Sequence, residues 1–130
     1  MAKQRTLVFF LCIFSVVSPS ARSYAREKIT FTPKKGAGHY EAKPASCEIQ
    51  VFKDSKPDQE HVDLGVVNYH DERHRLSDKS LNLEVAMPKI KALACKAGGD
   101  ALIDIRVTEV RRLEFAMFNV RATVVRFAPK

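Results

Sequence analysis

Two histidines separated by three residues are the clearest candidates for chemistry in this chain. His70 and His74 flank an Asp-Glu-Arg triplet, and imidazoles at positions i and i+4 would share one face if the segment were helical. Zinc needs a further ligand, for which Asp78 or His61 is available. The pattern therefore allows a divalent-metal site, and the alternative is a polar loop that water solvates.

Nucleophilic catalysis has less support than metal binding. No serine stands in a Gly-x-Ser-x-Gly elbow, and the cysteines beyond the N-terminal region are expected to be oxidised. Asp100 and Asp104 lie close in sequence, but the first suits a turn after glycine and the second a polar sheet face. We therefore expect no enzymatic activity and keep a hydrolase only as a competing hypothesis.

The N-terminal segment, residues 1–23, has the order of features typical of a secretory signal peptide. Lys3 and Arg5 precede an apolar run over residues 7–17, and small residues follow it. The run is far short of the roughly 20 residues of a membrane-spanning helix. Cys12 lies inside it without the small preceding residue that lipoprotein processing needs. We expect a periplasmic or secreted protein with no stable membrane insertion after cleavage.

Length and charge limit the class of protein further. Removing residues 1–23 from the 130-residue chain leaves 107 residues, enough for one domain, which we place at residues 47–130. The net charge is +7, of which +3 falls in residues 1–23 and +3 in residues 24–46, so the domain carries +1. Since no basic stripe or aromatic platform is visible, we expect no nucleic-acid partner.

The two remaining cysteines predict a disulfide. Cys47 and Cys95 are an even pair in a compartment where thiols oxidise. A bridge across this 48-residue separation would stabilise the fold by about 4 kcal/mol in the loop-entropy model. A redox-active or metal-binding pair is the alternative, but it lacks the close Cys-x-x-Cys spacing.

Apolar periodicity predicts the elements of the domain. Strands are expected where apolar residues recur at every second position, at 47–51, 62–69, 101–108 and 116–124. Helical spacing runs from Leu83 to Ala97; because Pro88 is tolerated only in a first turn, we expect the regular helix to begin near Met87 and to end at Gly98-Gly99. The predicted fold class is α+β, a four-stranded sheet with one helix packed on one face.

Two further segments are expected to lack regular structure. Residues 24–46 mix a few apolar side chains with lysine, glycine and proline, and we expect a flexible basic tether. The alternative is that Ile29 or Phe31 adds a strand to the sheet. Residues 70–79 are strongly polar and are expected to form the longest loop of the domain.

Several short motifs of the core, residues 47 to about 127, occur together in a known group. They are the Cys-x-Ile-x-Val opening at Cys47, Leu64-Gly65-Val66, the Ala86, Ile90, Ala94 spacing, the Gly98-Gly99-Asp100-Ala101 break and the last alternating strand. Together they resemble the RcsF-like and YbjQ-like α+β families. Exported members include an outer-membrane lipoprotein that senses envelope damage by binding partner proteins and has disulfides from its first strand to its helix.

The resemblance implies a shared fold and a non-catalytic function exerted through an envelope or secreted protein partner. The chain departs from that sensor in two respects, because it has no lipoprotein anchor and can form one disulfide rather than two. The anchor's role is therefore not carried over.

The sheet face opposite the helix supplies the candidate partner-binding residues, since an antiparallel sheet with one helix leaves its second face open. These candidates are Gln50, Arg106, Asn119 and Arg121. Arginines are also frequent around the second hairpin. There they either form a basic region or make cross-strand ion pairs with Glu109 and Glu114. The partner's identity and the oligomeric state stay open.

Overall fold

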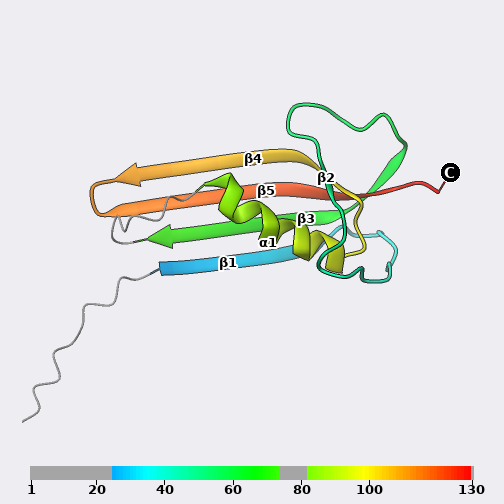
Figure 1. The fold of residues 1–130 in the computed structure, drawn as a ribbon, viewed down its shortest axis with the longest axis horizontal. Coiled ribbons are helices and arrows are strands. Elements are labelled where there is room, and N and C mark those ends of the chain that lie inside the picture. Colours follow the sequence, from blue (N-terminus) through cyan, green and yellow to red (C-terminus); the bar gives the residue numbers. More distant parts are fainter. Residues whose placement is uncertain (1–24, 74–81, 130) are drawn as a thin grey trace, which may run out of the picture.

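The structure is a computed structural model that describes residues 25–73 and 82–129, and there one helix packs on a five-stranded sheet (Figure 1). The elements are β1 (Ala25–Pro33), β2 (Gln50–Val51), β3 (His61–Arg73), α1 (Leu83–Lys96), β4 (Ala101–Arg112) and β5 (Phe115–Phe127). The predicted α+β class is confirmed, and the sheet has one strand more than the sequence predicted.

The additional strand is β1, which forms an edge of the sheet where a tether was expected. It pairs antiparallel with β3 along its whole length. Ile29 and Phe31 pack against the core, while Lys28 and Thr30 alternate with them on the other face. The tether prediction for residues 24–46 was therefore wrong for the strand, because the two-residue alternation is short and charged side chains on its outer face obscure it.

The sheet order is β1-β3-β5-β4-β2, so the two longest strands, β3 and β5, lie at its centre. All neighbours pair antiparallel except β2 with β4. The strand predicted at 47–51 is reduced to two residues. The strand predicted at 62–69 instead extends to Arg73, because β1 and β5 both pair with that extension. Residues 70–73 therefore belong to the sheet and not to the predicted loop.

The helix begins earlier than Pro88 alone suggested. Asn82 caps it, because its side-chain oxygen accepts a hydrogen bond from the Val85 backbone N–H at 2.9 Å. Pro88 is exposed within the helix, so the carbonyl that it leaves without a helical donor can face water. The predicted glycine end is confirmed, since Gly98 has φ +79° and the Gly98 and Gly99 N–H groups donate back into the last turn.

The main core lies between α1 and the sheet. Fully buried Ile90 and Ala94 of the helix meet the inward side chains of β3 and β5, among them Val67 and Val120. All five inward residues predicted for the last strand are buried, namely Ala116, Phe118, Val120, Ala122 and Val124.

Two bulges adjust the sheet. At Gly65 the register of β3 against β5 shifts, and an added Cβ would collide with the Thr32 carbonyl, so the neighbouring strand approaches closely there. At Asp104 (φ +50°) β4 also shifts register. Ile103 consequently packs on the face opposite the helix while Ile105 packs under it. The prediction that both share one face was wrong because the bulge resets the alternation.

Candidate functional site

The face of the sheet turned away from α1 brings together three of the four predicted partner-binding residues. Arg106 lies opposite Arg121 in the register, and Asn119 follows two residues away on the same face. We call the surface around them the open face. It is formed by three register rows across β1, β3, β5 and β4: Arg26, Glu72, Met117 and Val110; Lys28, His70, Asn119 and Thr108; Thr30, Asn68, Arg121 and Arg106.

The open face is strongly basic although the domain as a whole is nearly neutral. Its twelve residues contain four cations, Arg26, Lys28, Arg106 and Arg121, and one carboxylate, Glu72. None of the four cations takes part in an ion pair recorded within residues 25–73 and 82–129. The sequence does not predict a basic stripe, because two of these cations, Arg26 and Lys28, lie on β1, where a tether was expected.

Gln50 does not join the other three. It pairs with Ala101 at the far edge of the sheet, next to a small apolar cluster of Ala101, Ile103 and Val125 that is covered by Phe52 and Phe127. Val125 lies four residues beyond Arg121 along β5, about 13 Å in an extended strand. The apolar corner begins one row beyond Arg121, where Ile103 lies opposite Thr123.

His70 is bound within the open face rather than presented to a metal. Its Nδ1 contacts Asn119 Oδ1 at 2.5 Å, and its Nε2 lies 3.3 Å from Glu72 Oε2. It lies on a strand, so the helical pairing assumed for the histidines does not apply to it. His61 begins the same strand nine residues earlier, about 30 Å away.

The predicted metal ligands His74 and Asp78 lie outside the described residues. Within the parts that the structure describes, no three His, Cys, Asp or Glu side chains are grouped to hold a metal ion.

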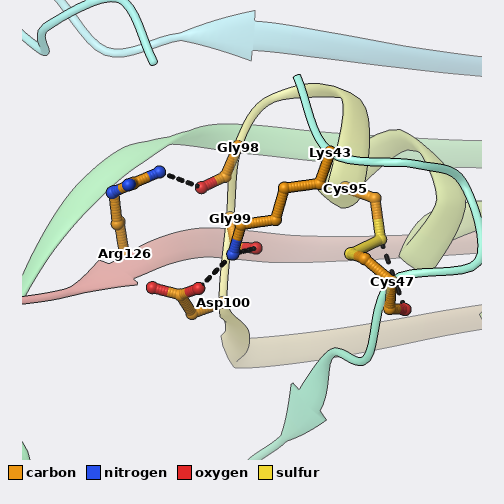
Figure 2. The surroundings of a disulfide bond; sticks show 7 residues. All are labelled: Lys43, Cys47, Cys95, Gly98, Gly99, Asp100 and Arg126. Atoms are coloured by element: carbon orange, nitrogen blue, oxygen red, sulfur yellow. Dashed lines mark hydrogen bonds and ion pairs between the residues drawn. A yellow bond between two sulfur atoms is a disulfide. The ribbon is translucent and has the colours of Figure 1, made fainter. Parts of the chain in front are cut away.

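The disulfide joins Cys47 and Cys95 as predicted, with their Cα atoms 5.9 Å apart, and fastens the segment before β2 to the helix (Figure 2). Near the disulfide, residues 98–100, which follow the helix, contact side chains from two other parts of the chain, Lys43 and Arg126. Lys43 Nζ donates to the Gly99 carbonyl at 3.1 Å and pairs with Asp100, and Arg126 donates to the Gly98 carbonyl at 3.0 Å. We call this group of Lys43, the disulfide and residues 98–100 the hub.

The hub holds a carboxylate in its charged form. Burial alone would raise the pKa of Asp100, but hydrogen bonds from Lys43 and from the Phe127 backbone N–H at 2.8 Å outweigh it and lower the pKa. Asp100 therefore lies in the turn after the glycines, as the sequence suggested. Its carboxylate also binds the last residue of β5 through the Phe127 N–H.

A second polar cluster lies under the helix, and sequence reasoning missed it. The Tyr69 hydroxyl donates to Glu27 at 3.0 Å, Lys89 of the helix donates to the same carboxylate at 2.6 Å, and Arg73 donates to the buried Asp71 at 3.1 Å. The hydrogen bond from Lys89 lowers the pKa of Glu27, while burial raises that of Tyr69. The cluster joins β1, β3 and α1.

Two of these residues, Glu27 and Asp71, lie in segments for which the sequence predicts a tether and a loop. Only recognition of β1 from the sequence could have revealed the cluster, because β1 sets Glu27 opposite Asp71.

Comparisons with protein-family models, with curated proteins and with solved structures found no significant match. In the described ranges, no helix combines the length and apolar character needed to cross a membrane.

Proposed function

We propose that this chain is an exported, non-catalytic binding module that acts through a protein partner in the envelope or outside the cell, in the manner of the envelope-sensor domains that its core motifs resemble. The observation that carries the proposal is the open face, where Arg106, Asn119 and Arg121 converge on a surface that no described element covers. Export rests on the predicted signal peptide and is in keeping with the disulfide.

The chemistry of the described residues supports binding more than catalysis. His70, the imidazole on the open face, is held between Asn119 and Glu72. The two cysteines among the described residues, Cys47 and Cys95, are joined to each other. The Glu27 and Asp71 carboxylates are engaged by Lys89 and Arg73 under the helix. These groups stabilise the fold and leave the open face as the surface on which recognition can act.

Site-specific photo-crosslinking tests the proposal. A photoreactive residue replaces Thr108 on the open face or Glu109, its exposed neighbour on the other face of β4, in protein exported by its native cell. We expect a discrete crosslinked product from position 108 and none from 109. Equal products at both positions, or products at 109 alone, would contradict the assignment of the open face.

The metal-binding alternative that uses His70, His74 and Asp78 has its own test. The protein is titrated with zinc, copper and nickel in a calorimeter. If the module acts through proteins, we expect no binding of these metals at micromolar concentrations. Stoichiometric binding that His70→Asn abolishes would replace the proposal, since His70 would have to exchange Asn119 and Glu72 for the metal.

A further inference from the structure

Two arginines occupy an unfavourable arrangement in the last register row of the open face. Arg106 and Arg121 stand directly opposite each other on neighbouring antiparallel strands, and both are exposed. Like charges in directly opposed positions destabilise a sheet. Neither guanidinium has an ion-pair or hydrogen-bond partner in residues 25–73 and 82–129.

No carboxylate within residues 25–73 and 82–129 is recorded in an ion pair with either arginine, although the exposed Asp104 lies two residues before Arg106 at the bulge of β4. Asn68 lies opposite Arg121 on β3, and Thr108 and Asn119 occupy the next register row. The carboxylate of the open face, Glu72, is two rows away, about 13 Å along the strands, and it contacts His70 at 3.3 Å. The charge of the pair is therefore left for a ligand.

A hollow of about 390 Å³ adjoins Arg121 and offers neutral hydrogen-bonding groups. Thr32, Asn68 and Thr123 line it together with the arginine, and Asp63 and Lys34, which pair with each other, line it as well. Guanidinium groups bind carboxylates through two parallel N–H bonds, and hydroxyl and amide groups can complete such contacts.

We infer that Arg106 and Arg121 form a receptor for carboxylates, and that the partner presents an acidic protein segment to the open face; the inference rests on the function proposed above and names its partner class. Charge complementarity supports it, because Arg26 and Lys28 extend the basic surface to the opposite edge. The twelve residues of the open face include no phenylalanine, tyrosine or tryptophan for stacking bases, and the His70 ring is held between Asn119 and Glu72. The apolar residues among the twelve are Met117 and Val110, both in the row farthest from the arginine pair, and they include none of the tryptophan, phenylalanine or leucine side chains with which a membrane-binding surface enters lipid.

The test measures binding of a fluorescein-labelled twelve-residue peptide of alternating glutamate and glycine to the purified protein, with the glutamine counterpart as the negative probe. We expect saturable binding of the glutamate peptide that weakens as salt is raised. Arg106→Gln and Arg121→Gln should each weaken it about tenfold, as loss of one charge-assisted hydrogen bond implies. Arg111→Gln removes the same charge from the opposite face of β4 and should leave binding within about twofold.

Other outcomes would separate the inference from the proposed function. Equal loss in Arg121→Gln and Arg111→Gln would show that net charge alone attracts the peptide and would overturn the inference. Binding to phosphatidylglycerol vesicles or to single-stranded DNA, but not to the peptide, would overturn it in favour of another anion. If crosslinking from position 108 persists unchanged in the Arg106→Gln, Arg121→Gln double variant, the open face binds a partner by other chemistry and only the carboxylate inference fails.

Discussion

The hub and the open face use charge in opposite ways. At the hub, Lys43 pairs with Asp100 beside the disulfide, and Arg126 combines a carbonyl hydrogen bond with stacking 4.5 Å above the Tyr40 ring. On the open face, Arg106 and Arg121 oppose each other without a described partner. Basic residues thus have ion-pair or hydrogen-bond partners at the hub, whereas the two arginines of the open face have no recorded partner among the described residues.

This difference separates stability from recognition within one small sheet. A domain of this size has a total stability of about 5–15 kcal/mol, so one or two kcal/mol is a large fraction of it. The hub supplies covalent, hydrogen-bonding and packing constraints at one end of the strands. These constraints offset the stability that the opposed arginines cost, and that arrangement is the one assigned above to binding of a carboxylate ligand.

The largest expected effect is at Gly98, where the hub combines tight packing with a positive φ. Gly98→Ala would hold alanine at φ +79° with its Cβ 2.8 Å from Tyr40 Cβ, and we expect a loss of about 2–5 kcal/mol in the free energy of unfolding. Gly36→Ala is the matched control, because Gly36 has φ +82° with no atom within 4 Å of an added Cβ. It should cost about 1–2 kcal/mol. Equal losses in urea unfolding would show that the Tyr40 segment does not pack on Gly98.

Removing the disulfide should have the next largest effect. The Cys47→Ala, Cys95→Ala double variant is expected to lose about 2–4 kcal/mol of unfolding free energy, because its unfolded chain is no longer constrained. The folded fraction should still bind the acidic peptide with unchanged affinity, since the open face lies on the other side of the sheet. Two readily alkylated thiols in wild-type protein isolated without reductant would contradict the bridge.

The sequence predicts the hub better than it predicts the open face, and the reason is physical. The Gly98-Gly99 helix end and the buried alternation of β5 are local signals that one segment carries alone, and the pairing of Cys47 with Cys95 follows from the cysteine count without knowledge of the strand register. The open face instead depends on register between four strands, one of which, β1, alternates for only a few residues. His70 shows the same limit, because a polar run resembles a loop until the strands on both sides that pair with it are known.

Asp100 provides a smaller, pH-dependent test of the hub. Asp100→Ala removes the Lys43 pair and the hydrogen bond from Phe127, and we expect a loss of about 1–3 kcal/mol at neutral pH. Because the folded protein lowers this pKa from 3.8, the folded state binds fewer protons than the unfolded state. The contribution is therefore complete above about pH 5 and is lost as the pH falls below 4. A difference between variant and wild type that stays constant from pH 7 to pH 3 would contradict the charged pair.

The smallest expected effect has the opposite sign and lies on the open face. Arg121→Thr removes one of two opposed cations, so we expect the free energy of unfolding to increase by about 0.2–1 kcal/mol, more at low salt than at high salt. Threonine also favours strands, so the repulsion itself is measured by the double-mutant cycle with Arg106→Thr, in which strand propensity cancels. Arg121→Thr should stabilise the wild type more than it stabilises the Arg106→Thr variant. If the cycle shows no coupling energy at low salt, the two guanidinium groups point apart. If it shows coupling and the Arg121→Thr variant also binds the glutamate peptide more weakly, the open face is arranged for its ligand at the expense of stability.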